Sequence, residues 1–553
     1  MSFSSYDRKE QFRKLTEEQW DVLVIGGGIT GAGIALDASN RGMNTAVVEM
    51  QDYAAGTSSR STKLVHGGLR YLKQFEVKMV AEVGKEREIV YENGPHVTTP
   101  EWMMLPFYKE GNFGPYSTNL GLMVYDYLAG VKRGERRRMF SPKEAMEREP
   151  LVNGENLKGA GFYVEYKTDD ARLTLDVMKK AVQFGATATN YAKVTEFIYE
   201  NGVVTGAVIE DTITGDTYQV KAKRIINAAG PWVDTLREED GSKQGKTLQL
   251  TKGTHLVFDQ SDFPLQQAIY FDSPDGRMIF AIPRDGKVYI GTTDTVYEGD
   301  ISHPTVTLED RDYLLRAIKS MFPDVHVTKD DVESSWAGLR PLVHEEGKDP
   351  SEISRKDEIF VSESGLISIA GGKLTGYRKM AEHVIDLVRD QLADDYQIYF
   401  GDTDTIDTPI SGGDVGGSKG FEKFKYEKVI QGVETGLKKE VAEKFVNFYG
   451  SNIDKLYRIY EENKTKAGEE NIDPALFAQL VYSLTEEQTY KPVDFFIRRT
   501  GALFFNIRFV HEHKEEVIRY MAKELGWTEE EKRTYTEELD QLLEEAVTPV
   551  EYV

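Results

Sequence analysis

The stretch Asp21-Val-Leu-Val-Ile-Gly-Gly-Gly-Ile-Thr-Gly31 determines the predicted fold. Its apolar run, Val22 to Ile25, is typical of a buried parallel strand. The run enters a Gly26-x-Gly28-x-x-Gly31 turn, and residues 32–40 then have the pattern of a helix with small residues on one face. A second strand, residues 45–49, ends on an acid 18 residues after the last glycine. This order of strand, turn, helix and strand predicts a Rossmann-like dinucleotide-binding domain.

Each part of this motif has a physical reason. Gly26 permits a tight turn, Gly28 lets the backbone approach a pyrophosphate at the helix N-terminus, and Gly31 lets the helix pack closely on the strand. The carboxylate of Glu49 is suited to accept hydrogen bonds from a ribose diol. The nucleotide contacts expected from this unit are Gly26, Gly28, Ile29, Thr30, Gly31 and Glu49.

The loop from Gly56 to Tyr71 favours a flavin over a nicotinamide cofactor. It is rich in hydroxyls and glycines, with basic residues and few apolar positions, so it can hydrogen-bond a long polar ligand. A nicotinamide enzyme would normally continue with another helix and strand at this point. An ordinary surface loop is the alternative. The loop positions expected to bind FAD are Thr57, Ser58, Ser61, Lys63, Leu64, His66, Gly67 and Gly68.

Two later segments add to the flavin prediction. A hairpin with strands at 203–209 and 217–220 leads into a buried strand that ends in Asn227-Ala-Ala-Gly-Pro-Trp232. Further on, residues 367–375 have the pattern of a strand, a glycine pair and a helix start, whose amides suit the electron-rich edge of a reduced flavin. The further FAD contacts expected are Val194, Ala228, Gly230, Gly372, Lys373, Leu374 and Thr375.

Composition limits the remaining chemistry. The 553 residues include no cysteine, which excludes disulfides, thiol nucleophiles and cysteine-ligated clusters, and no metal site is expected. A net charge of −24 opposes nucleic-acid binding, so an anionic ligand needs a local basic pocket. The N-terminus lacks a signal-peptide pattern and no stretch of about 20 apolar residues occurs. We therefore expect a cytoplasmic protein, soluble or peripheral on the inner face of the cell membrane.

These motifs resemble those of the FAD-dependent, quinone-linked glycerol-3-phosphate dehydrogenases, within the wider group of glycine- and amino-acid-oxidase-like flavoproteins. The most specific stretch is Lys63-Leu-Val-His-Gly-Gly-Leu-Arg-Tyr71, and Asp494-Phe-Phe-Ile-Arg-Arg-Thr500 is similar to the family's C-terminal helical domain. The other stretches that carry the resemblance are Gly26 to Gly31, Asn227 to Trp232, Lys252-Gly-Thr-His255, Ile290-Gly-Thr-Thr-Asp294, Gly338-Leu-Arg340-Pro-Leu and Gly371-Gly-Lys373 to Arg378.

The resemblance implies an activity and a set of partners. The enzyme would oxidise sn-glycerol 3-phosphate to dihydroxyacetone phosphate by hydride transfer to FAD and pass the electrons to a membrane quinone. One alternative is an oxidase that passes them to O2 and forms H2O2; the internal insertion of such oxidases is not seen here. A second is a non-catalytic or RNA-modifying FAD-binding protein, which the acidic charge opposes. A homodimer is one expected assembly.

The substrate site follows from the same resemblance together with the chemistry of the substrate. A phosphate dianion suits guanidinium groups, and Arg70 and Arg340 are assigned to it, with Tyr71 beside Arg70. A neutral imidazole suits removal of the hydroxyl proton, so His255 is the expected base and His66 the second choice. Arg340 also stabilises a developing alkoxide. Lys373 is expected to contact the flavin or the substrate. For each, a structural role is the alternative.

Domain boundaries and a membrane surface complete the prediction. The fold class is mixed α/β: an FAD-binding domain (20–75, 160–232, 345–400), a β-sheet substrate domain (76–159, 233–344), a linker (401–421) and an all-helical domain (422–553). The basic-apolar cluster at 132–140 and the apolar run Trp102 to Phe107 together suit a seat on anionic lipid. The alternative is a solvated loop beside an ordinary core segment.

Overall fold

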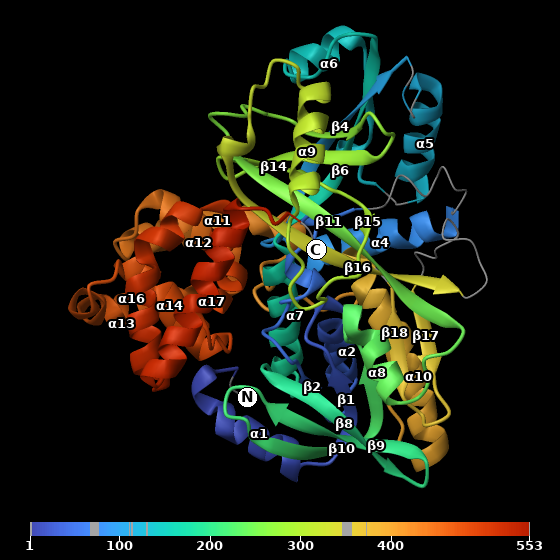
Figure 1. Cartoon of the computed structure of the whole chain (residues 1–553), viewed down its shortest axis with the longest axis vertical. Coiled ribbons are helices and arrows are strands. Elements are labelled where there is room, and N and C mark those ends of the chain that lie inside the picture. Colours follow the sequence, from blue (N-terminus) through green and yellow to red (C-terminus); the bar gives the residue numbers. More distant parts are fainter. Residues whose placement is uncertain are drawn as a thin grey trace.

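The computed structural model describes residues 3–66, 77–109, 111, 114–128, 131–345, 357–371 and 373–551. Within these residues the chain forms two β-sheets, and a group of C-terminal helices lies beside them (Figure 1). The predicted mixed α/β class, with a Rossmann-like sheet, a second sheet and a helical C-terminal part, is confirmed.

The first sheet is the predicted nucleotide-binding sheet. Its strands run in the order β17-β18-β10-β1-β2-β7, with β8 and β9 continuing from β10, and β1 is parallel to β10 and β2. β10 is also parallel to β18. The bounds are β1 (Trp20–Ile25), β2 (Thr45–Val48), β7 (Thr187–Thr189), β8 (Ala192–Glu200), β9 (Val203–Asp211), β10 (Thr217–Asn227), β17 (Glu358–Val361) and β18 (Ile367–Ala370).

Side chains on the two faces of β1 enter two different cores. Val22 and Val24 pack with helices α2, α7 and α10, whereas Leu23 and Ile25 pack with α1 and the β8–β9 hairpin. This explains why the strand reads as continuously apolar, because a parallel strand buried on both faces has no polar side. The helices are α1 (Arg8–Glu17), α2 (Ile29–Asn40), α7 (Asp170–Gln183), α8 (Val233–Glu239) and α10 (Tyr377–Tyr396).

The second sheet forms the other half of the cofactor region. It has the order β15-β11-β14-β13-β12-β4-β6-β3, with β16 paired to β11 and β5 to β6. Its strands are β3 (Leu64–Val65), β4 (Thr98–Tyr108), β5 (Arg138–Phe140), β6 (Leu157–Thr168), β11 (Lys246–Asp259), β12 (Ala268–Asp272), β13 (Met278–Arg284), β14 (Lys287–Gly291), β15 (Thr295–Val296) and β16 (Val332–Glu345). The associated helices are α4 (Val77–Asn93), α5 (Pro115–Leu128), α6 (Pro142–Arg148) and α9 (Leu308–Met321).

Sheet membership refines the expected domain boundaries. Strand β6 pairs with β4 along its length, so residue 160 lies inside a strand of the second sheet, and the chain returns to the first sheet's helices only at α7. We propose the same domain division with this boundary placed between β6 and α7.

In the described ranges, no helix combines the length and the apolar character needed to cross a bilayer.

The C-terminal helices pack against one face of the second sheet. Trp336 of β16 and Tyr289 of β14 share an apolar core with Phe495 and Phe504. Part of the stretch predicted as a linker is helical, because α11 begins at Gly417, directly after Gly416 in a left-handed turn (φ 81°). The elements are α11 (Gly417–Glu434), α12 (Lys439–Tyr449), α13 (Ile453–Glu470), α14 (Pro474–Glu486), a π-helical segment η9 (Asp494–Arg499), α15 (Ala502–Phe505), α16 (Ile507–Leu525) and α17 (Glu529–Val547).

Candidate functional site

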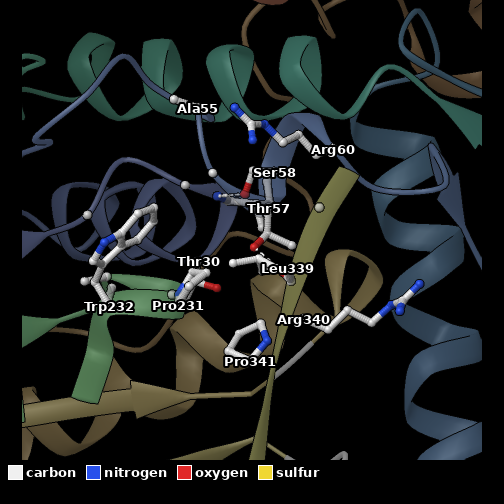
Figure 2. A pocket seen from close by; sticks show the side chains of 18 of the residues that line it. Thr30, Ala55, Thr57, Ser58, Arg60, Pro231, Trp232, Leu339, Arg340 and Pro341 are labelled. Carbon is white, nitrogen blue, oxygen red and sulfur yellow. Dashed lines mark hydrogen bonds between the residues drawn. The ribbon is translucent and has the colours of Figure 1, made fainter. Parts of the chain in front are cut away.

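A cavity of about 660 Å³ lies at the carboxyl ends of four neighbouring strands of the first sheet. Residues that end or follow β1, β2, β10 and β18 line it on one side, and residues of β11 and β16 line it on the other. Figure 2 shows Trp232 and Arg340 at opposite ends of this cavity, with Thr57, Ser58 and Thr30 between them. Ligands of α/β proteins bind at such carboxyl ends, so the position agrees with a dinucleotide site.

The glycine-rich turn is built as the motif predicts. Gly26 has a φ of 120°, and a Cβ there would overlap the carbonyl oxygen of Ala228. A Cβ at Gly31 would overlap the carbonyl oxygen of Gly26, so the helix reaches the strand only because this residue has no side chain. Gly28 is the N-cap of α2 and lines the cavity. Gly31 itself lies beneath the cavity wall and does not line it.

Glu49 lies at the end of β2, where the nucleotide ribose is expected. Its Oε2 accepts a hydrogen bond from the Gly27 amide at 2.6 Å and its Oε1 one from the Gln51 amide at 2.8 Å. Burial raises the pKa of this carboxyl, and the two backbone amides act against that effect. The carboxylate is thereby held in a fixed orientation at the cavity wall.

The hydroxyl-rich loop connects the two sheets across the cavity. Ser58 Oγ accepts a hydrogen bond from the Ile29 amide at the start of α2, at 2.9 Å. Thr57 Oγ1 donates to the carbonyl of Leu339 in β16 at 2.7 Å, and Tyr289 OH donates to the carbonyl of Thr62 at 3.0 Å. The loop therefore has a defined shape set by contacts with both sheets. Its lining positions include the predicted Thr57, Ser58, Ser61, Leu64 and His66.

Lys63 lies in the same loop but faces away from the cavity. Its side chain is 3% exposed, and its Nζ donates to Asp170 at 2.6 Å and to the Ser59 carbonyl at 3.0 Å. Its ammonium also lies over the ring of Trp336, 5.3 Å from the centroid. The structure therefore places this predicted FAD contact in a buried ion pair. Thr375 is likewise not a lining residue; its hydroxyl exchanges hydrogen bonds with the backbone of His66.

His255 is a buried lining residue in β11. Its Nε2 lies 3.0 Å from Thr62 Oγ1, and its ring stacks on Trp336 with centroids 4.7 Å apart. Burial, the charge of Arg340 and the charge of Lys63 together hold the pKa of His255 well below its usual value. The imidazole is therefore neutral at pH 7. A Cβ at Gly291 would overlap this ring, so the neighbouring strand leaves the necessary space.

Arg340 lies in β16, beside β11 and one third exposed. Its Nη1 donates to the Thr293 carbonyl at 3.2 Å and its Nη2 to Thr292 Oγ1 at 2.9 Å. Both partners belong to the predicted Gly-Thr-Thr-Asp segment after β14. A Cβ at Gly253 would overlap Nη2, so this glycine lets the guanidinium lie across β11. The site thus holds a positive charge within the same cavity as a neutral imidazole.

His66 and Lys373 both line the cavity. Burial, with added effects from Lys373 and Arg340, lowers the pKa of His66 to about 4. The remaining predicted contacts that line the cavity are Thr30, Ile29, Val194, Ala228, Gly230 and Leu374. The predictions for Gly67, Gly68, Arg70, Tyr71 and Gly372 lie outside the described residues.

Sequence reasoning missed several lining residues. Arg60 is one of the lining residues, and burial together with the Arg498 charge lowers its pKa to about 10. Its signal was present, since it is a basic residue inside the hydroxyl-rich loop. Leu339 and Pro341 flank the predicted Arg340, and Trp232 ends the predicted Asn-Ala-Ala-Gly-Pro-Trp segment.

These features fit FAD. Gly26 and Gly31 have no room for a side chain, and a fixed carboxylate stands where the ribose is expected. The cavity also continues past the loop to the histidine and arginine of the second sheet. A dinucleotide with a long second half fills such an extended site, whereas a mononucleotide would use only one end. The fold and the site together define a dinucleotide-binding flavoprotein.

Comparisons with known proteins agree with this class. The family model described as FAD dependent oxidoreductase matches residues 21–378, and the one described as C-terminal domain of alpha-glycerophosphate oxidase matches residues 403–532. The chain is 60% identical over 549 residues to the aerobic glycerol-3-phosphate dehydrogenase of Bacillus subtilis (strain 168), covering 99% of each chain. It is 56% identical to that of Staphylococcus haemolyticus (strain JCSC1435), covering 99% of this chain and 98% of the other.

A solved structure resembles the whole chain. The glycerol-3-phosphate dehydrogenase from Bacillus halodurans, complexed with FAD, is 51% identical and covers 100% of both chains with a TM-score of 0.87. An L-alpha-glycerophosphate oxidase from Mycoplasma pneumoniae, at 19% identity and a TM-score of 0.55, shares the fold over 70% of this chain and 97% of its own. The chain belongs to the FAD-dependent oxidoreductase family and, within it, to the aerobic glycerol-3-phosphate dehydrogenases.

Proposed function

We propose that the enzyme oxidises sn-glycerol 3-phosphate to dihydroxyacetone phosphate with FAD as the hydride acceptor. The observation that carries the proposal is the placement of His255 and Arg340 on the paired strands β11 and β16, at one cavity with the glycine cradle. The names of relatives that are 55–60% identical over nearly their full length support the substrate.

His255 is the proposed base of this reaction. Bound FAD supplies the hydride acceptor, and the hydroxyl proton of the substrate needs a separate acceptor. The lowered pKa keeps the imidazole unprotonated at pH 7, so it has a free lone pair. Stacking on Trp336 and the contact between Nε2 and Thr62 Oγ1 fix the ring orientation.

Arg340 is the proposed partner of the negative charges of the substrate, on its phosphate and on the oxygen that loses its proton. Its guanidinium is anchored on the Thr293 carbonyl and the Thr292 hydroxyl. A guanidinium held this way stabilises the oxygen that loses its proton, and it contributes to binding the phosphate dianion. Arg70 and Tyr71 stay predicted phosphate-site residues. Lys373, which lines the same cavity and whose charge acts on His66, is the proposed further cation of the site.

A quinone is the proposed electron acceptor. The relatives' designation as aerobic dehydrogenases supports a dehydrogenase, and the oxidase alternative is not favoured. The test measures dihydroxyacetone phosphate formed in air with and without a soluble quinone analogue, together with H2O2. We expect product formation to depend on the quinone with little peroxide. One peroxide per product without quinone would identify an oxidase instead.

A membrane surface is the proposed source of that quinone. Helix α5 presents an apolar stripe at helical spacing: Tyr116 (91% exposed), Leu120 (58%), Met123 (46%) and Tyr127 (86%). The basic residues Arg136 and Arg138 are exposed nearby, and Arg137 donates to Asn119 and Asp126 of α5. An apolar helix face flanked by arginines suits an anionic lipid surface. The 102–107 run contributes less than expected, because Met103, Met104 and Leu105 are fully buried.

Liposome co-sedimentation tests this surface. We expect Tyr116→Ser with Tyr127→Ser, or Arg136, Arg137 and Arg138 all →Glu, to lose binding to anionic vesicles. The matched charge control changes three basic residues to Glu on the exposed surface of the C-terminal helices: Lys423, Lys439 and Arg533. Equal binding by all variants would contradict the proposal.

A homodimer also stays a prediction. Sedimentation equilibrium of the holoenzyme checks it.

A further inference from the structure

The C-terminal helices reach the adenosine end of the cofactor cavity through one buried aspartate. Asp52 lies three residues after Glu49 and is 1% exposed. Arg498 Nε donates to its Oδ2 at 2.5 Å, Arg499 Nη1 to Oδ2 at 2.5 Å and Arg499 Nη2 to Oδ1 at 2.7 Å. Both arginines belong to the π-helical segment η9, more than 440 residues further along the chain.

Neighbouring residues complete this contact. Asn190 Nδ2 donates to Asp52 Oδ1 and to the carbonyl of Gln488, each at 2.9 Å. Tyr53 OH donates to Gln488 Oε1 at 2.8 Å, and Gln488 Nε2 donates to the Ala188 carbonyl at 2.9 Å. The turn after β2, the loop after β7 and the C-terminal segment are therefore one hydrogen-bonded unit.

The same turn shapes the glycine-rich motif. The Ala54 amide donates to the Gly27 carbonyl at 3.1 Å, and Ala55 lines the cavity. A Cβ at Gly27 would lie 2.7 Å from Tyr53 Cδ1 and 2.8 Å from Glu49 Cβ, so turn and motif are in close contact. The Gly27 amide is also the donor to Glu49 Oε2. A shift of the Asp52 turn would move both the motif and the carboxylate that faces the ribose.

The charges of this unit balance around Asp52. Burial acts to raise the pKa of the Asp52 carboxyl, but the two guanidiniums outweigh it and the pKa is lowered. Arg498 also donates to Asp494 at 2.6 Å, and Tyr191 OH donates to the same carboxylate at 2.7 Å. Removing one partner would leave a buried charge without compensation, so the turn would rearrange.

We propose that Arg498 and Arg499 are positioning residues for FAD, through which the C-terminal helices hold the Asp52 turn and so the adenosine-ribose end of the cofactor site. The helical domain thereby supports the cofactor site from behind. It contributes no residue to the cavity lining near Glu49. The affinity of the enzyme for FAD depends on this contact. The KM for glycerol 3-phosphate, which is set by the substrate end built from β11 and β16, does not depend on it.

The test measures FAD release from the holoenzyme by the rise in flavin fluorescence after dilution. We expect Asp52→Asn to release FAD faster by roughly 10-fold or more, because one carboxylate charge between two guanidiniums is lost. Arg499→Lys, which keeps the charge, is expected to fall between Asp52→Asn and wild type. For the fraction that retains FAD, the flavin absorption spectrum and the KM for glycerol 3-phosphate stay as in wild type.

Arg41→Gln is the matched control. Its side chain is fully buried, and its Nη2 donates to Asp37 at 2.6 Å and its Nη1 to Asp386 at 2.7 Å. It is therefore also a buried ion pair, but it lies at the end of α2 away from the glycine-rich motif. We expect Arg41→Gln to lower the unfolding temperature without faster FAD release. Equal release rates from Asp52→Asn and wild type, or equally fast release from Arg41→Gln, would overturn the proposal. If Asp52→Asn does not fold, the comparison of Arg499→Lys with Arg41→Gln decides.

Discussion

His255 and Trp336 stack face to face across the paired strands β11 and β16, with ring centroids 4.7 Å apart and planes 12° from parallel. Trp336 Nε1 in turn donates to the Ser61 carbonyl at 3.2 Å, which connects the stack to the hydroxyl-rich loop. The imidazole is thus held by a large side chain beneath it and a loop beside it. This arrangement supplies the orientation and the lowered pKa that a base at this position requires.

Replacement of His255 is expected to remove most activity while FAD stays bound. His255→Gln keeps a polar side chain but removes the base, and general-base removal typically costs about 100-fold or more in rate. Steady-state oxidation of glycerol 3-phosphate, with flavin content measured by absorbance, checks this. Wild-type kcat at full flavin loading would remove His255 from the mechanism.

The fall of kcat/KM at acid pH is expected to report the protonation of His255. Because the pKa of His255 is held well below its usual value, the base stays neutral as pH falls below 6.5. We expect kcat/KM to stay level from pH 8 to about 6.5 and to fall only at lower pH. A limb that starts near pH 7 or above would contradict this assignment.

Stability is expected to fall at acid pH through His66. Its folded pKa is about 4, while the unfolded chain titrates near 6.5, so the unfolded state binds more protons between these values. Its contribution is complete above pH 6.5 and is lost progressively as pH falls toward 4. The loss of unfolding free energy between pH 7 and 5 should therefore be smaller in His66→Gln than in wild type. His326→Gln, at an exposed position, controls for the substitution itself.

Gly253→Ala is expected to displace Arg340. The added Cβ would overlap Arg340 Nη2 and Thr292 Oγ1, so the guanidinium must leave its anchored position. We expect roughly 10-fold or greater loss of kcat/KM with normal FAD content. Gly468→Ala, where the new methyl group meets open space, controls for the substitution itself. Unchanged kcat/KM in Gly253→Ala would show that the position of Arg340 does not matter.

Lys63 is expected to matter for stability more than for flavin contact. Lys63→Met would leave Asp170 buried without its ammonium partner at 2.6 Å, which costs about 3–5 kcal/mol of unfolding free energy. Chemical denaturation of the holoenzyme checks this value. A loss below about 1 kcal/mol would mean that the ion pair is not a structural support.

The parts that sequence predicted well depend on local pattern. The unit from Asp21 to Glu49 is a contiguous strand, turn, helix and strand, so its periodicity and glycines define it without the rest of the chain. The hairpin of β9 and β10 was predicted for the same reason. Cavity residues such as Ala228 and Leu374 follow strands of the same sheet, and parallel topology brings those ends together.

The parts that sequence did not predict depend on long-range partners. Lys63 finds Asp170 at a separation of 107 residues, and Arg499 finds Asp52 at 447. No spacing rule connects residues that far apart, so a basic residue in a flavin loop was read as a ligand contact. The apolar stripe of α5 was missed for a related reason: an amphipathic pattern does not say which face neighbouring elements will cover.

The most direct measurement is the visible spectrum of the oxidised holoenzyme during anaerobic titration with sn-glycerol 3-phosphate. We expect the yellow flavin absorbance to bleach on addition of substrate, and the flavin of His255→Gln to bleach far more slowly at the same flavin content. Flavin that stays fully oxidised in the wild-type enzyme at saturating glycerol 3-phosphate would contradict the proposed reaction.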